Sequence, residues 1–103
     1  EGDRILVDFS KKAKASLRGS DQLTRFGGDE FMAILPDTDL EQALLVANRF
    51  HEAGRQSQPI AWSVSIGISE WLDEDDSLDA LLTRADQALY KSKALGRNRT
   101  HAA

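Results

Sequence analysis

The sequence predicts an α+β fold in which helices pack on a mostly antiparallel sheet. Three features indicate this class: apolar residues recur at helical spacing in three stretches, a glycine-rich turn joins two short β-prone runs, and a third run alternates apolar with polar residues. The expected order is helix, strand, strand, helix, strand, helix. A chain of 103 residues suits one domain with one hydrophobic core.

The first helix is predicted over residues 4–18, where apolar residues are three or four positions apart. A hairpin should follow, with strands at 23–26 and 31–35 around a Gly-Gly-Asp-Glu turn. Because five successive residues of the second strand are apolar, we expect this strand to be buried on both faces in the middle of the sheet.

The second helix is predicted to begin after Pro36, with Thr38 or Asp39 as its N-cap, and to end at Gly54. A polar connection follows this helix. Residues 62–69 then alternate apolar and polar side chains and predict the third strand.

The last helix is predicted to begin after Ser77, its expected N-cap, and to be closed by Gly96. An acidic run at residues 73–76 precedes it. Such carboxylates either bind a metal ion or complement the positive end of the helix dipole. Their position just before a helix favours the second interpretation.

The charge balance restricts the possible partners. Thirteen Lys and Arg residues against seventeen Asp and Glu residues give a formal net charge of −4, which disfavours binding to DNA or RNA duplexes. The chain has no cysteine, which excludes a disulfide framework and a thiolate zinc site and suits a reducing cytoplasm. Since no apolar run is long enough to cross a bilayer, we expect no membrane contact by this segment.

The hairpin turn carries the residues best suited to chemistry. Gly27 and Gly28 allow the backbone to approach a phosphate with its N–H groups as donors. Asp29 and Glu30 would repel a phosphate unless a divalent cation lies between the phosphate and the two carboxylates. Oxygen ligands beside substrate phosphates are the usual setting for Mg²⁺. A solvated turn is the alternative interpretation of these four residues.

Several motifs at matching spacing resemble the GGDEF domain of bacterial diguanylate cyclases. The signature itself occupies residues 27–31, the strand motif Ser-Val-Ser-Ile-Gly occupies residues 63–67, and the terminal motifs occupy residues 85–93 and 96–98. The Gly-Asp pair at residues 2–3 stands where the family has such a pair at the start of a helix. The resemblance covers essentially the whole chain.

The resemblance implies a ferredoxin-like, nucleotidyl-cyclase-type fold. It also implies an enzyme that condenses two GTP molecules to cyclic di-GMP with release of two pyrophosphates. In this family the reaction depends on Mg²⁺ (or Mn²⁺) and takes place in a homodimer with one GTP on each subunit. The resemblance also implies an upstream sensor domain and a cytoplasmic location. The domain could be the cytoplasmic module of a membrane-bound sensor protein.

Roles for individual residues follow from the same resemblance. Asp29 would bind the metal and help to deprotonate the attacking hydroxyl, and Glu30 would be a second carboxylate of the metal site. The substrate-binding residues would be an acceptor for guanine, two glycines at the phosphates and two cations for the terminal phosphates: Asp3, Gly27, Gly28, Lys93 and Arg97. Taken alone, Lys93 and Arg97 would be a solvated end of the last helix, one helical turn apart, and Asp3 would be an N-cap.

A second candidate site lies before the hairpin. The segment Arg18-Gly19-Ser20-Asp21 resembles the RxxD inhibitory site of the family, which lies five residues before the signature. Arg18 and Asp21 would bind cyclic di-GMP, and Arg49 stands where the family has an auxiliary arginine for the same ligand. A surface ion pair is the alternative interpretation of Arg18 and Asp21.

The chain departs from the family pattern at its front. The family has a helix, a central strand with a metal-binding Asp, and a guanine-recognising Asn before this point, and none has a counterpart here. Residues 1–103 are therefore interpreted as a partial domain whose absent strand would lie between those at 31–35 and 62–69. We expect little or no cyclase activity from this fragment alone. A non-catalytic cyclic di-GMP receptor and a structural module are the alternatives for the longer protein.

Overall fold

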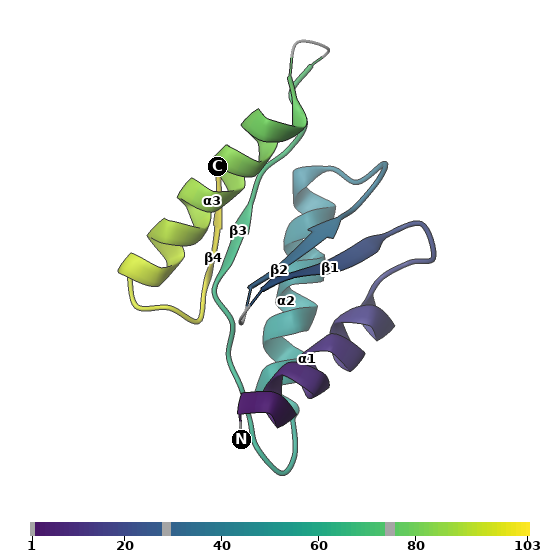
Figure 1. Ribbon diagram of the computed structural model, residues 1–103, viewed down its shortest axis with the longest axis vertical. Helices are drawn as coiled ribbons and strands as arrows, with labels where there is room; N and C mark the ends of the chain where they lie inside the picture. The colour runs from purple at the N-terminus through teal and green to yellow at the C-terminus, as the bar shows by residue number, and fades with distance from the viewer. Residues whose placement is uncertain (1, 28–29, 74–75) are drawn as a thin grey trace.

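The computed structural model describes residues 2–27, 30–73 and 76–103 (Figure 1). Over these ranges the chain forms three helices and four strands: α1 (Gly2–Ser16), β1 (Gln22–Gly27), β2 (Glu30–Ile34), α2 (Leu40–Gln56), β3 (Ile66–Ile68), α3 (Leu78–Ala94) and β4 (Thr100–Ala102). The first six elements in the chain confirm the predicted order and the α+β class, whereas β4 was not predicted. None of the helices in these ranges combines the length and the apolarity that a membrane span needs.

The hairpin strands β1 and β2 are antiparallel, with Leu23 opposite Ala33. The prediction that the second strand is buried on both faces is wrong, because Ala33 is exposed and Ile34 is 41% exposed. At its other end, Phe31 packs against Phe9 of α1. Within the described ranges β2 pairs with β1 alone, so its apolar run lacks the second neighbour that covers a strand in mid-sheet.

The second sheet consists of two parallel strands, β3 and β4, with Ile66 opposite Thr100 and Ile68 opposite Ala102. The strand predicted at 62–69 is shorter than expected, because only its central part pairs with another strand in the described chain. α3 supplies the crossover connection that two parallel strands require, and it packs against both of them (Figure 1). The described sheets are therefore one antiparallel and one parallel pair, not a mostly antiparallel sheet.

α3 approaches β3 closely because Gly67 has no side chain. A Cβ at this position would come within 2.3 Å of the Ala85 carbonyl oxygen and the Leu89 nitrogen, which are both backbone atoms. Ser92 adds a polar anchor: it is fully buried, and its Oγ donates to the Ile66 carbonyl oxygen at 2.8 Å. β3 and α3 therefore form one tightly packed unit.

An aromatic cluster around Phe9 joins α1, α2, the hairpin and the segment before β3. The ring centroid of Phe9 lies 4.8 Å from that of Phe31, 5.9 Å from that of Phe50 and 5.4 Å from that of Trp62. Trp62 is only 7% exposed, and its Nε1 donates to Asp8 Oδ2 at 2.6 Å. This cluster fixes the hairpin relative to the two helices.

The start of α2 is capped by Asp39, which decides between the two predicted N-caps, Thr38 and Asp39. The Asp39 side chain accepts a hydrogen bond from the backbone of Gln42, and the Gln42 side chain accepts one from the backbone of Asp39. This reciprocal pair is a capping box. α2 then continues to Gln56, beyond the predicted end at Gly54.

Both predicted ends of α3 are confirmed. Ser77 is the N-cap of the helix, and Gly96, with a φ of 117°, comes directly after its C-cap Leu95. Of the acidic run before α3, residues 74 and 75 lie outside the described residues. Asp76 accepts a hydrogen bond from Arg84 Nη2 at 2.6 Å and another from the backbone of Leu72. These hydrogen bonds, of which the one from Arg84 has the largest effect, hold the pKa of the Asp76 carboxyl far below its usual value. Asp76 therefore serves as an ion-pair partner that holds the loop before α3.

Candidate functional site

The structure brings the start of β2 and the end of α3 together. Glu30 is the first residue of β2, and its side chain is 58% exposed. Lys93 lies in the last turn of α3, and its Nζ is 3.9 Å from Glu30 Oε2. A carboxylate predicted for the metal and a cation predicted for the phosphates are thereby neighbours, although they are far apart in the sequence.

Other residues predicted for this site are only partly covered by the structure. Gly28 and Asp29 lie outside the described residues, as does the side chain of Asp3, whose backbone belongs to α1. Gly27 is the last residue of β1, and the pairing with β2 becomes irregular between Arg25 and Gly27. The roles of Asp3, Gly27, Gly28 and Asp29 therefore stay predictions.

Arg97 does not lie on the last helix. The prediction that Lys93 and Arg97 are one helical turn apart on that helix is therefore wrong. α3 ends at Ala94, and Gly96, Arg97 and Asn98 have φ angles of 117°, 59° and 49°. The Arg97 N–H donates to the Ser92 carbonyl oxygen at 2.9 Å, and the residue is exposed. The cation is therefore presented from a turn that α3 anchors, because the left-handed backbone from Gly96 onward ends the helix before Arg97.

Arg18 and Asp21 bind each other in the turn between α1 and β1. Arg18 Nε lies 3.3 Å from Asp21 Oδ2, Nη2 lies 3.1 Å from Oδ1, and the Arg18 backbone N–H donates to Oδ2 at 2.8 Å. These hydrogen bonds lower the pKa of the Asp21 carboxyl below its usual value, so it stays ionised. The Asp21 side chain is 3% exposed and that of Arg18 is 56% exposed. The turn thus presents a guanidinium in front of a buried carboxylate.

Arg18 and Asp21 share a cavity of about 260 Å³ with Arg49 of α2. The structure therefore brings together all three residues predicted for the inhibitory site. Gln42 also lines the cavity, two helical turns before Arg49, so helical spacing could have indicated that both lie on the same face of α2. The remaining lining residues come from the end of α1, the turn after β2 and α2: Ser16, Leu35, Thr38, Leu45 and Val46.

Thr38 is a site residue that sequence reasoning missed. It was considered only as an N-cap, but its Oγ1 accepts a hydrogen bond from Arg18 Nη2 at 2.7 Å. The carbonyl oxygen of Pro36 accepts a second one from the same nitrogen, also at 2.7 Å. No periodicity relates these residues, because the contact joins two separate turns.

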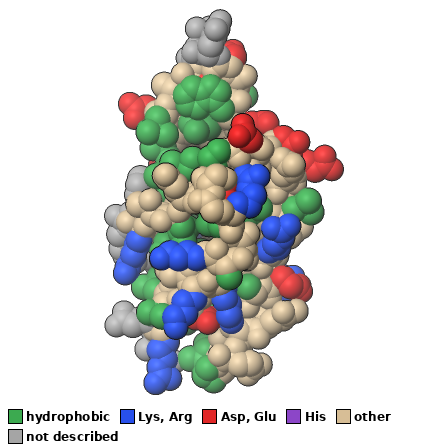
Figure 2. Space-filling view, turned by 90° about the vertical axis from the view of Figure 1, so that its right-hand side faces the viewer, with side chains coloured by type: hydrophobic (Ala, Val, Ile, Leu, Met, Phe, Trp, Pro, Cys, Tyr) green, Lys and Arg blue, Asp and Glu red, His purple; other side chains and the backbone are tan. Residues whose placement is uncertain are grey.

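The turn between α1 and β1, at the right of Figure 1, belongs to a face rich in cations. Figure 2 looks onto this side and shows many Lys and Arg side chains across its middle and lower part. The whole chain carries a formal net charge of −4, so positive charge is concentrated here against the overall balance. An anionic ligand would meet a locally favourable potential on this face.

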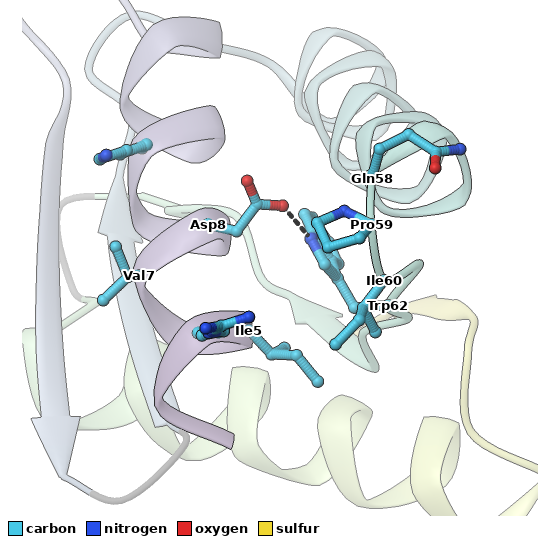
Figure 3. A pocket seen from close by; sticks show the side chains of 9 residues that line it. Ile5, Val7, Asp8, Gln58, Pro59, Ile60 and Trp62 are labelled. Carbon is cyan, nitrogen blue, oxygen red and sulfur yellow. Dashed lines mark hydrogen bonds between the residues drawn. The ribbon is translucent and has the colours of Figure 1, made fainter. Parts of the chain in front are cut away.

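A larger groove of about 370 Å³ lies between α1 and the segment before β3 (Figure 3). Asp8 lies at this groove and accepts a hydrogen bond from Trp62 Nε1, shown as the dashed line. Ser57 and Lys12 also bind the Asp8 carboxylate, at 2.8 Å and 3.2 Å. The described residues that line the groove include none of those predicted for catalysis or ligand binding.

Comparison with known proteins gives consistent matches. The family described as "Diguanylate cyclase, GGDEF domain" matches residues 1–99. The response regulator PleD of Caulobacter vibrioides is 38% identical over 105 residues, a match that covers 94% of this chain but only 23% of PleD. The GGDEF domain of YfiN (TpbB) from Pseudomonas aeruginosa has a TM-score of 0.89 at 30% identity, over 98% of this chain and 67% of that one. The coiled coil and GGDEF domain of DgcB from Caulobacter crescentus, in complex with cyclic di-GMP, has a TM-score of 0.77 at 26% identity, over 98% of this chain and 57% of that one.

These matches do not depend on the five-residue signature alone. The family match runs from residue 1 to residue 99, a range that contains every residue lining the cavity of Arg18, Asp21 and Arg49. The structural similarity to the YfiN domain likewise covers nearly the whole chain. The chain belongs to the family of GGDEF domains.

Proposed function

We propose that the longer protein of which this chain is a part is a diguanylate cyclase. It would condense two GTP molecules to cyclic di-GMP in a homodimer with one GTP on each subunit. The observation that carries this proposal is the contact between the signature hairpin and α3, where Lys93 Nζ lies 3.9 Å from Glu30 Oε2. A triphosphate beside this hairpin has a cation and a carboxylate for a metal ion within reach.

Two equivalent steps build the product. In each step the 3′-hydroxyl oxygen of one GTP bonds to the α-phosphorus of the other. The bond from that phosphorus to the leaving pyrophosphate breaks, and Asp29 accepts the hydroxyl proton. Lys93 and Arg97 would bind the terminal phosphates that leave. The remaining substrate contacts would be made by the backbone of the two glycines and by the guanine acceptor: Gly27, Gly28 and Asp3.

The cofactor of this site would be Mg²⁺ or Mn²⁺, which would neutralise phosphate charge during the transfer. Glu30 fits such an ion, because its exposed carboxylate is the hard oxygen ligand that these metals prefer. Asp29, its neighbour in the sequence, would be the second carboxylate. Substrate phosphates would supply further oxygen ligands, as is usual for Mg²⁺ bound by one or two carboxylates.

The test is GTP turnover with Mg²⁺ by the full-length protein and by its Asp29→Ala variant. We expect the variant to make cyclic di-GMP at least about a hundredfold more slowly, since it loses a metal ligand and a proton acceptor. Asp79→Asn, at an exposed carboxylate on α3, is the matched control and should keep the normal rate. Equally robust synthesis by wild type and Asp29→Ala would overturn the role of Asp29.

We further propose that the cavity of Arg18, Asp21 and Arg49 binds cyclic di-GMP and mediates product inhibition. Two guanidinium groups and an ionised carboxylate suit the phosphates and the guanine edges of this ligand. The complex of the similar DgcB domain with cyclic di-GMP supports this assignment. Arg18→Ala should abolish binding of cyclic di-GMP in calorimetry, together with product inhibition. Unchanged binding would refute it.

A cyclic di-GMP receptor without synthesis is the second candidate, and the cavity favours it as much as it favours product inhibition. Binding without any GTP turnover by the full-length protein would decide for the receptor. In either case we propose that residues 1–103 are part of a larger domain. Its further strand would lie between β2 and β3, since each described sheet has only two strands. A cytoplasmic location and an upstream sensor domain complete the proposal.

A further inference from the structure

The turn formed by Pro36, Asp37 and Thr38 contacts the inhibitory cavity from outside the RxxD segment. Arg18 Nη2 donates to the Pro36 carbonyl oxygen and to Thr38 Oγ1, both at 2.7 Å. Thr38 Oγ1 in turn donates its single hydrogen to the Pro36 carbonyl oxygen at 2.9 Å. The hydroxyl is thereby fixed as an acceptor for the guanidinium.

The backbone of this turn is strained at its centre. Asp37 has a φ of 50°, a left-handed conformation that residues other than glycine rarely adopt. In this conformation the residues on both sides of Asp37 direct an acceptor at the same guanidinium. Asp21 and, more weakly, Asp37 raise the pKa of Arg18, so the turn also places negative charge beside the cation. Strained backbone of this kind persists where surrounding contacts over-determine it.

These contacts decide what Arg18 offers to a ligand. Among the described residues, the bonds to Asp21, Pro36 and Thr38 use Nε and Nη2, and Nη2 shares its two hydrogens among three acceptors. Within this part of the chain, the two N–H groups of Nη1 are therefore available for recognition. The Arg18 side chain is 56% exposed, and an exposed arginine without such contacts samples many rotamers. Ordering it only when a ligand arrives would reduce the affinity.

We propose that Thr38 is a positioning residue for cyclic di-GMP: its hydroxyl and the Pro36 carbonyl hold Arg18 in its binding geometry before the ligand arrives. This inference rests on the proposed inhibitory function of the cavity. Thr38 itself lines the cavity and directly precedes the capping box of α2, the helix that carries Arg49. The turn therefore links Arg18 to the start of the helix on which Arg49 lies.

The experiment is calorimetric titration of the full-length protein and its Thr38 variants with cyclic di-GMP. Thr38→Val keeps the side-chain shape but removes the hydroxyl, and should weaken the affinity about tenfold through loss of a hydrogen bond to a charged group. Thr38→Ser keeps the hydroxyl and should restore the affinity to within about twofold of wild type. A valine variant that unfolds at a lower temperature but binds with unchanged affinity would overturn the proposal.

Two further variants make the result specific. Thr83→Val removes a hydroxyl that donates only within α3, to the Asp79 carbonyl oxygen at 2.9 Å, and should leave the affinity unchanged. If Arg18→Ala abolishes binding but Thr38→Val does not weaken it, the positioning role fails and the inhibitory site stands. If Arg18→Ala leaves the affinity unchanged, the site and the positioning role fail together.

Discussion

The close packing of β3 on α3 predicts a large effect of Gly67→Ala. The new Cβ would lie 2.3 Å from the Ala85 carbonyl oxygen and the Leu89 nitrogen, whereas ordinary contacts begin at 3.4 Å. Since these are backbone atoms, α3 would have to move away from β3 by about 1 Å. Overpacking of this kind costs about 3 kcal/mol. The same movement would stretch the bond from Ser92 to Ile66, now 2.8 Å, beyond hydrogen-bonding distance.

Urea unfolding of wild type, Gly67→Ala and Gly19→Ala measures this effect. We expect Gly67→Ala to lower the free energy of unfolding by about 3 kcal/mol. Gly19→Ala is the matched control: a Cβ there meets no atom within 4 Å, so stability should stay unchanged or rise by up to about 1 kcal/mol. If Gly67→Ala lowers the free energy of unfolding by less than about 1 kcal/mol, the reasoning is refuted, because α3 could then move away from β3 at little cost.

Three other predictions concern pH and fragment activity. His51 is 8% exposed, and its burial, followed by the charge of Arg55, lowers its pKa, so the free energy of unfolding should fall as the pH drops below 6.5. Urea titrations of wild type and His51→Gln at several pH values measure this dependence. The variant should lose it, and an unchanged pH dependence would contradict the assignment to His51. The pKa of the Asp76 carboxyl is lowered, so this group stabilises the folded protein above pH 3.8 and loses that contribution as the pH falls further. The difference in unfolding midpoint between wild type and Asp76→Asn should therefore narrow below pH 3.8, and a constant difference would show that the charge is not responsible. The isolated 103-residue chain should show little or no GTP turnover where the full-length protein is active, and equal rates would refute the partial-domain interpretation.

Local signals account for the parts of the fold that could be predicted. The cap at Ser77 and the helix end before Gly96 depend on the backbone preferences and hydrogen bonds of those residues themselves. β4 lacks such a signal, because its three residues form a strand only by pairing with β3. The exposure of Ile34 likewise depends on which strands and helices cover β2, which the apolar run does not reveal.

The candidate sites show the same division. The resemblance to the family implied that Arg18, Asp21 and Arg49 share a site, and one cavity contains all three. Thr38 was missed because its contact with Arg18 depends on the left-handed backbone at the residue before it. The helical placement of Arg97 was wrong because spacing was extended past the glycine that ends α3.

The buried hydroxyl of Ser92 limits how this region can vary among related sequences. Its hydrogen goes to the Ile66 carbonyl oxygen, so the contact of 3.1 Å with His101 requires Nδ1 of that ring to be the donor. A larger side chain at this fully buried position has no room, and alanine would remove the hydroxyl's hydrogen bonds to the Ile66 carbonyl oxygen and to the His101 ring. Relatives that keep the present distance between α3 and β3 should therefore retain a serine directly before Lys93. Where that serine is replaced, we expect compensating changes at the positions of Gly67 and His101.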